Sequence, residues 1–328
     1  MDLDLLARTI DKLGQPAFRT RQVWRWAAQG AQGYEEMTDL PRDLRARLQE
    51  HVPFSTLEAE TETHSRDGTV KVLFRTTDGR PVEAVLMRYR DGRHSLCLSS
   101  QSGCPLTCTF CATGQMRFGR NLSRWEIVDQ ALHFRRLTPV DHAVFMGMGE
   151  PLMNVDNVLG ACDRLPDLGI TPRRTAISTV GWIPGIRRLA EDPRPLRLAL
   201  SLHAADPALR SELMAVNDRY PLEEVLAVCA AHYERKRRRV FVEYVMLAGI
   251  NDSVAQAVGL ADLLEPGIYK VNLIPYNPTA SQYEGSSPKA IDAFREALER
   301  RGLSATVRLT RGRDIDAACG QLAASRAV

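Results

Sequence analysis

Residues 103–111 read GCPLTCTFC and place Cys104, Cys108 and Cys111 within eight positions of the chain. Three thiols that converge on one loop indicate a metal centre. A fully ligated iron–sulfur cluster requires four cysteines and a structural zinc site requires a fourth Cys or His, but no further ligand lies nearby. The loop therefore favours a cubane cluster with one iron open to a substrate or cofactor. The alternative is a zinc ion completed by a distant group such as His133 or His142, although C-x3-C-x2-C is not a usual zinc spacing.

The composition describes a globular protein without a strong overall charge. At about 150 residues per domain, its 328 residues suggest two domains, and 44% hydrophobic residues can supply a core for each. Lys and Arg number 43 against 40 Asp and Glu, a net charge of +3, so any contact with RNA has to be local. The acidic start does not resemble a signal peptide, and no apolar stretch is long enough for a membrane span. We expect a soluble cytoplasmic protein that binds no membrane. Seven cysteines are too few for a disulfide scaffold.

Changes in hydrophobic periodicity divide the chain into three parts. Residues 1–56 have helical spacing and predict a small helical domain. Residues 57–94 contain short strands separated by Asp-Gly turns and predict a β connector. Residues 95–328 alternate strands with helices, which predicts a parallel sheet, open or closed into a partial barrel, with chemistry at the carboxyl ends of its strands. The strands expected in this last part are 95–99, 143–146, 175–179, 196–202, 240–246 and 268–274.

At the cysteine loop the sequence resembles the radical S-adenosylmethionine (SAM) enzymes, whose C-x3-C-x2-C loop with an aromatic before the last cysteine holds a [4Fe–4S] cluster. Within that superfamily it is similar to the RNA adenine C2-methyltransferases that modify 23S ribosomal RNA and transfer RNA. Six blocks carry the similarity in order: CLSSQ at 97–101, FCATG at 110–114, GMGEP at 147–151, SLHA at 201–204, NLIPYNP at 272–278 and RGRDIDAACGQL at 311–322. The resemblance implies an α/β fold with a partial (β/α)6 radical SAM barrel, and a [4Fe–4S] cluster on Cys104, Cys108 and Cys111.

The resemblance also implies a SAM-binding set at the ends of the expected strands. The glycines of 147–150 let the backbone approach a ligand closely, and Glu150 can accept hydrogen bonds from the ammonium group of SAM. Each member of the set alone would be an ordinary loop or interior residue, but their common edge of the sheet favours a site. The implied set is Gly149, Glu150, Ser178, Ser201, Leu202, His203 and Asn277.

The chemistry of adenine C2 explains why the resemblance implies a role in the reaction for two further cysteines, Cys97 and Cys319. This carbon is electron-poor and has no lone pair to attack a methylsulfonium, so a simple methyl transfer fails. By resemblance, Cys319 first takes a methyl group from one SAM, and a radical from a second SAM abstracts hydrogen from that S-methyl group so that the carbon adds to the base. Release then requires removal of the C2 proton by Glu83 and a transient disulfide between Cys97 and Cys319. A reductant such as a flavodoxin-type protein has to supply electrons.

The local sequence pattern indicates whether each of three further residues packs in the core or is available for chemistry. Cys162 and Cys229 lie on apolar helical stripes and are expected in the core. Glu83 lies on a predicted strand at 82–87, where period two places it with Val85 and Met87 and, without the resemblance, on a solvent-facing side.

Candidate RNA contacts are the basic run at 235–239, residues 116–121 and the N-terminal helical domain. A basic helix end is also favoured by the helix dipole alone, so the run is not specific for RNA. The target adenine has to be single-stranded or extruded. Two classes of function remain open: a monomeric radical SAM RNA methyltransferase, and a non-catalytic metal-stabilised RNA-binding protein. Within the enzymes, the nearest rival is the adenine C8-methyltransferase of 23S ribosomal RNA that gives antibiotic resistance.

Overall fold

The structure is a computed structural model that describes residues 1–323. Within them, ten strands form one sheet in the order β1-β2-β3-β4-β7-β8-β9-β10-β11-β12. Their bounds are β1 Leu57–His64, β2 Val70–Thr76, β3 Pro81–Arg88, β4 His94–Cys97, β7 His142–Phe145, β8 Thr175–Thr179, β9 Arg197–Ser201, β10 Val240–Met246, β11 Tyr269–Pro275 and β12 Ala305–Val307. A separate antiparallel pair joins β5 (Gln101–Ser102) to β6 (Arg120–Asn121).

Every pairing from β4 to β12 is parallel, and helices connect successive strands. The connecting helices are α4 Arg124–Leu137, α5 Val155–Cys162, α6 Ile183–Glu191, α7 Pro207–Leu213, α8 Val216–Arg219, α9 Leu222–Lys236, α10 Val254–Leu263 and α11 Pro288–Arg300. Side chains fix where two of them start, because Ser123 with Glu126 and Ser253 with Gln256 form capping boxes. Six strand–helix units followed by β12 confirm the predicted α/β fold with a partial (β/α)6 arrangement.

The expected strands agree with the observed ones to within a residue or two at each end. The strands at 175–179 and 240–246 have the predicted bounds. The strand expected at 95–99 runs from His94 to Cys97, because the chain leaves the main sheet at residues 98–100 and pairs with β6 from Gln101 onward. Cys162 and Cys229 are buried in the main hydrophobic core, as predicted.

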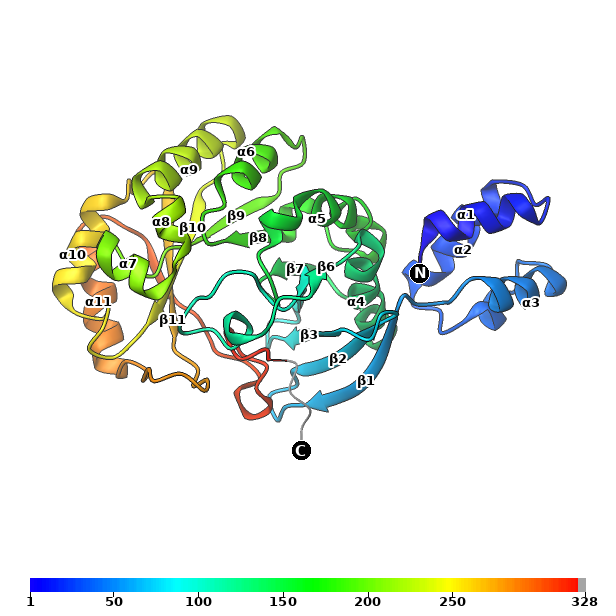
Figure 1. Ribbon diagram of the computed structural model, residues 1–328, viewed down its shortest axis with the longest axis horizontal. Helices are drawn as coiled ribbons and strands as arrows, with labels where there is room; N and C mark the ends of the chain where they lie inside the picture. The colour runs from blue at the N-terminus through cyan, green and yellow to red at the C-terminus, as the bar shows by residue number, and fades with distance from the viewer. Residues whose placement is uncertain (324–328) are drawn as a thin grey trace.

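The N-terminal helices form a lobe beside the sheet (Figure 1). They are α1 Leu3–Lys12, α2 Phe18–Gln29 and α3 Arg42–His51. The side chain of Asp2 caps α1 by accepting hydrogen bonds from the amides of Asp4 and Leu5. The lobe is tied to the rest of the chain by polar contacts, since the terminal amine of Met1 pairs with Asp129 and the indole of Trp24 donates to Asp167.

Strands β1 to β3 extend the core sheet. Strand β3 pairs antiparallel with β4, and Val85 lies opposite Cys97. The connector thereby brings the residues of β3 next to the start of the cysteine-bearing loop. Among residues 1–323, no helix combines the length and apolar character needed to cross a bilayer.

Candidate active site

A pocket opens at the carboxyl ends of the parallel strands, where sequence-distant polar groups meet. The three cysteines of residues 103–111 line one side of it. Residues that end or follow strands β7, β8 and β9 also line it. Those from the predicted set are Gly149, Glu150, Ser178, Ser201 and His203, and Glu243 and Cys319 also line the pocket.

Two predicted members lie elsewhere. The side chain of Leu202 is fully buried in the main core. Asn277 lines the neighbouring pocket, where its Nδ2 donates to the carbonyl of Cys319 over 3.1 Å. Its Oδ1 is buried and has no hydrogen-bond partner within residues 1–323. An unsatisfied amide oxygen costs free energy unless a ligand donor reaches it.

Burial controls the protonation of the three cluster-loop thiols. It raises the pKa of Cys104 to about 12 and raises those of Cys108 and Cys111 as well. They therefore need a cationic partner to become thiolates, and the irons of a cluster supply that charge. No three His, Cys, Asp or Glu side chains in the described chain lie close enough to hold one metal ion. A cubane does not require this, because each thiolate ligates a different iron.

The zinc alternative is not supported by the two histidines that it needed. His133 contacts Glu62 and packs edge-on against Phe74, and His142 contacts Asp141. Neither histidine lines the pocket with the cysteines.

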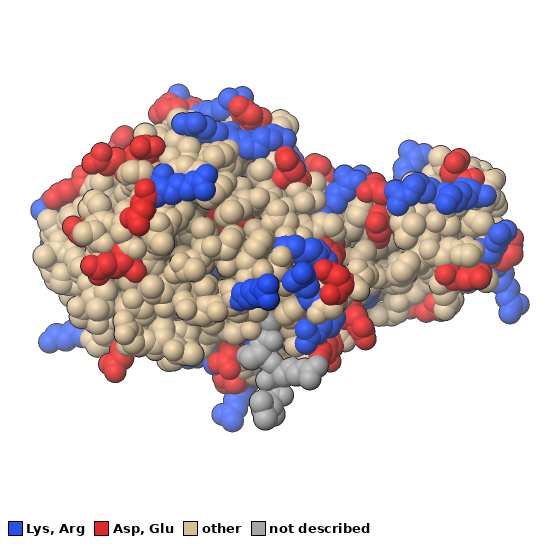
Figure 2. Space-filling model, in the orientation of Figure 1, with Lys and Arg blue, Asp and Glu red and all other residues tan. Residues whose placement is uncertain are grey.

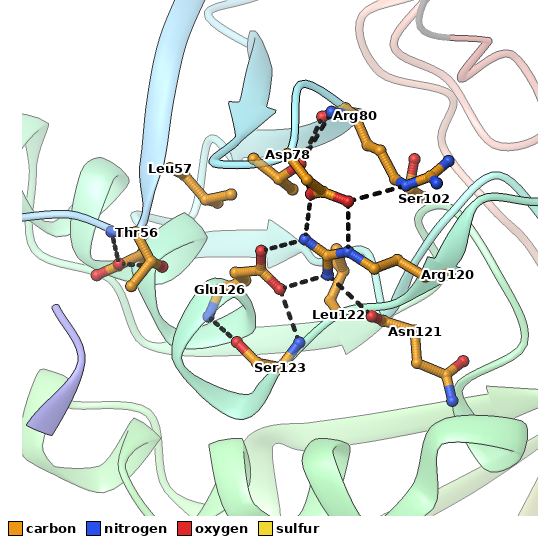
Figure 3. A network of polar contacts seen from close by, with 12 residues as sticks. Thr56, Leu57, Asp78, Arg80, Ser102, Arg120, Asn121, Leu122, Ser123 and Glu126 are labelled. Carbon is orange, nitrogen blue, oxygen red and sulfur yellow. Dashed lines mark hydrogen bonds and ion pairs between the residues drawn. The ribbon is translucent and has the colours of Figure 1, made fainter. Parts of the chain in front are cut away.

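An ionic network holds the neck of the cysteine loop (Figure 3). The β5–β6 pair closes this loop, and Arg120 on β6 donates to Asp78 over 2.6 Å and to Glu126 over 2.7 Å. These hydrogen bonds and charges hold the pKa of Asp78 well below its usual range. The neck is also tight at Gly103, whose φ is +73° and where an added Cβ would meet the carbonyl of Arg117 at 2.5 Å.

Glu150 presents a buried carboxyl group to the pocket. It accepts hydrogen bonds from the amides of Leu152 and Val180, each over 3.0 Å. Burial nevertheless raises its pKa to about 7. A bound ammonium group would offset that desolvation, which fits the role implied for Glu150.

His203 is a fixed, neutral imidazole at the pocket. Burial lowers its pKa to about 3. Its Nδ1 accepts a hydrogen bond from the amide of Val245 over 3.0 Å, so the neutral ring carries its proton on Nε2. Phe110 packs edge-on against this ring at 4.8 Å. The aromatic residue before the last cysteine thereby connects the cysteine loop to β9.

A second pocket is lined by both Cys97 and Cys319. Cys97 ends β4, and Cys319 follows the short 3₁₀ turn Arg313–Ile315. Both thiols line this pocket, and Cys319 also lines the first one. Burial raises the pKa of Cys97 to about 12 and that of Cys319 to about 11. The structure thus brings together two cysteines that most of the sequence separates.

Glu83 is buried, which corrects the solvent-facing alternative for its side of the strand. It is 1% exposed, because residues near the carboxyl terminus cover this face of β3. Its carboxylate lies 3.2 Å from Nζ of Lys71 and accepts from the amide of Ala323 over 3.0 Å. The predicted alternation itself is correct, since Val82, Ala84 and Leu86 pack in the main core.

Two charged residues of the site were missed by sequence reasoning. Arg308 lines the pocket of Cys97 and Cys319, and Glu243 lines the pocket of the three cysteines. Arg308 and Glu243 form an ion pair of 3.3 Å. The sequence does contain a signal for this pair, because Glu243 is a carboxylate inside the otherwise apolar strand β10. A carboxylate in such a position requires a buried partner.

Side chains of the basic run at 235–239 make contacts within the protein. Lys236 contacts the carbonyls of Asp192 and Arg194, and Arg237 pairs with Glu234. Lys and Arg are interspersed with Asp and Glu over the face in Figure 2, including the N-terminal lobe. This distribution agrees with the small net charge.

Comparisons with known proteins first give the class. Residues 98–261 match the model of the radical SAM superfamily, and residues 1–53 match the ribosomal RNA large subunit methyltransferase N-terminal domain. The crystal structure of a radical SAM methyltransferase from Sphaerobacter thermophilus matches with a TM-score of 0.94 and 42% identity, over 99% of this chain and 98% of that one. The fold and the cysteine pocket are therefore those of a radical SAM enzyme, a class that uses a [4Fe–4S] cluster and SAM.

Curated relatives then narrow the class. The dual-specificity RNA methyltransferase RlmN of Anaeromyxobacter sp. (strain Fw109-5) is 45% identical over 339 residues, 99% of this chain and 89% of the relative. The probable dual-specificity RNA methyltransferase RlmN of Symbiobacterium thermophilum is 45% identical over 333 residues, 98% of this chain and 90% of the relative. The chain belongs to this family of radical SAM RNA methyltransferases. Membership excludes the alternative of a non-catalytic RNA-binding protein.

Proposed function

We propose that this protein methylates C2 of a specific adenine in 23S ribosomal RNA and of an adenine next to the anticodon in transfer RNAs. The observation that carries the proposal is the position of Cys319, which lines both the pocket of the three cluster cysteines and the pocket that contains Cys97. A sulfur at this junction can take a methyl group on one side and be attacked by a second thiol on the other. The family membership supports RNA as the substrate.

The three cysteines of the loop would hold the [4Fe–4S] cluster, and Glu150, Ser178, Ser201 and His203 would surround SAM. Together the bound groups supply a methyl cation equivalent and a radical that activates the transferred methyl. His203 would offer its Nε2 proton as a fixed donor, and Glu150 would accept a hydrogen bond from the ammonium group of SAM. The unpartnered Oδ1 of Asn277 is available for a ligand donor.

The remaining steps use side chains of the chain itself. Cys319 carries the methyl group as S-methylcysteine and becomes joined through it to the adenine. The adduct loses one electron, which returns the electron spent in generating the radical, and its C2 proton, which Glu83 takes. Lys71, 3.2 Å away, balances the charge of Glu83 before that transfer. Cys97 attacks the sulfur of Cys319, and the product leaves as the disulfide forms.

We place the protein in the cytoplasm as a monomer, with a flavodoxin-type electron donor and a thiol reductant that reopens the disulfide. The N-terminal lobe is the proposed RNA-binding accessory domain, supported by the match of residues 1–53. The proposed domains are this accessory domain over residues 1–56, a β connector over residues 57–94 and a radical SAM core over residues 95–328.

The test is product analysis after incubation of the anaerobic holoenzyme with SAM, reductant and either unmodified 23S ribosomal RNA or unmodified transfer RNA. Nucleoside mass spectrometry against standards should show 2-methyladenosine from both RNAs. Detection of 8-methyladenosine instead would identify the rival C8 activity. Product from only one RNA would limit the proposal to that substrate, and no methylated adenosine would contradict it.

A further inference from the structure

Arg308 occupies a fixed position beside the two thiols of the second pocket. Its backbone amide donates to the carbonyl of Leu273 over 2.8 Å, so the residue is attached to the end of β11. Its Nη1 lies 3.1 Å from Sδ of Met146 and 3.3 Å from Oε2 of Glu243. Met146, Cys97, Cys319 and Arg308 line the same pocket.

The carboxylate that holds Arg308 is itself fixed. Glu243 is 3% exposed and accepts a hydrogen bond from Nδ2 of Asn272 over 2.9 Å. The hydroxyl of Thr306 donates to Oδ1 of the same Asn272 over 2.7 Å. This chain of contacts crosses β10, β11 and β12, and it leaves the guanidinium little freedom to move.

The charge of Arg308 acts on both sulfurs. Burial raises the pKa of each thiol and Arg308 lowers it, while Glu243 opposes that effect at Cys319. Tyr89 and Arg311 also line this pocket, and Arg311 stacks on the Tyr89 ring at 5.2 Å. Arg308 is therefore placed where a negative charge on sulfur needs a cation.

We propose that Arg308 is a positioning residue for thiol exchange, which stabilises the sulfur anions that pass between Cys97 and Cys319, and that Glu243 keeps its guanidinium in place. The inference rests on the proposed function. In the exchange, the thiolate of Cys97 attacks Sγ of Cys319 and the S–S bond forms. The bond from Sγ of Cys319 to the product carbon breaks, and that carbon keeps the electron pair and takes a proton. A dithiol reductant later cleaves the disulfide, and one of the two cysteines leaves as a thiolate.

The experiment compares Arg308→Gln and Arg308→Lys with wild type and with a matched control, Arg311→Gln, in the same pocket. The first readout is the rate at which iodoacetamide alkylates Cys97 in anaerobic holoenzyme without RNA, measured by peptide mass spectrometry at pH 8. Arg308→Gln should lower this rate by more than about threefold, because loss of the nearby cation raises the pKa of Cys97 and so reduces its thiolate fraction. Arg308→Lys and Arg311→Gln should stay within about threefold of wild type.

The second readout is covalent RNA on Cys319 during turnover. Arg308→Gln should accumulate this adduct, while Arg308→Lys should not. If Arg308→Gln fails to fold because Glu243 is left buried without its partner, the double variant Arg308→Gln/Glu243→Gln removes both charges and gives the same readouts. Wild-type alkylation of Cys97 and no adduct in the charge-free variant would overturn the inference. A wild-type enzyme that makes no methyladenosine would overturn the proposed function instead, since the alkylation rate needs no RNA.

Discussion

The ammonium group of Lys71 lies 3.2 Å from the carboxylate of Glu83, and both side chains are largely buried on neighbouring strands. Strand β2 therefore provides the counter-ion for a carboxylate on β3 that would otherwise be costly to bury. The amide of Ala323 reaches the same carboxylate from near the other end of the chain. Glu83 thus sits where the connector meets the segment that carries Cys319.

Glu83→Gln should reduce formation of methylated adenosine by at least about 100-fold, because an amide cannot accept the C2 proton. The amide can still accept a hydrogen bond from Lys71, but the buried ammonium loses its counter-ion, so the thermal unfolding temperature should fall by several degrees while the fold is kept. Steady-state product formation and a melting curve check both. Glu58→Gln, at an exposed position on β1, is the matched control and should keep wild-type activity. Full activity of Glu83→Gln would remove the residue from the reaction.

Replacing any one of Cys104, Cys108 or Cys111 by Ala should remove the brown colour and most of the roughly four irons per chain expected for a cubane. Cys162→Ala should retain both, because this thiol packs in the core. Iron analysis and the absorption spectrum of anaerobically purified protein provide the measurement. A colourless wild-type protein with one bound zinc would contradict the cluster assignment.

Cys97→Ala should form the bond between Cys319 and the adenine but fail to break it. The variant should copurify with RNA fragments that resist denaturant and add mass to the peptide containing Cys319. Cys319→Ala should carry no such adduct and should form no methylated RNA. If Cys97→Ala turns over normally, another nucleophile performs release.

Arg120→Met should loosen the neck of the cysteine loop, because it removes the contacts to Asp78 and Glu126 that tie β6 to the β2–β3 turn and to α4. We expect an iron chelator to extract iron several-fold faster from this variant than from wild type. Arg117→Met changes another arginine of the same loop and serves as the control. Equal extraction rates in the two variants would show that the network does not protect the cluster.

Acidification should destabilise the fold through His232. Burial lowers the pKa of this residue to about 4, whereas a histidine in the unfolded chain titrates near 6.5. Between pH 7 and pH 5, His232 therefore becomes protonated in the unfolded chain but stays neutral in the folded chain. The free energy of unfolding falls by about 2 kcal/mol as a result. Over the same interval, the free energy of unfolding of His232→Leu should fall by about 2 kcal/mol less than that of wild type. Urea titrations at the two pH values measure this difference. The exposed His64→Leu should behave as wild type, and equal losses in all three proteins would contradict the assignment.

Local sequence patterns were sufficient for the elements and for the cluster loop. Strand β10 had its predicted bounds because an apolar run buried on both faces is visible in the sequence. The edge shared by Glu150, Ser178, Ser201 and His203 followed from parallel topology, which aligns the carboxyl ends of strands. Leu202 shows the limit of this reasoning, because its neighbours on either side line the pocket while its own side chain points into the core.

The sequence by itself determined the α/β class, the order of strands and helices and the loop that presents three thiols, because each depends on residues close together in the chain. Only the tertiary structure decided the burial of Glu83, the shared pocket of Cys97 and Cys319 and the pairing of Arg308 with Glu243. These relationships join residues that are 65 or more positions apart. The first two arise because the segment after β12 packs against β3 and β4, and the third because β10, β11 and β12 lie side by side in the sheet. No local periodicity encodes these contacts.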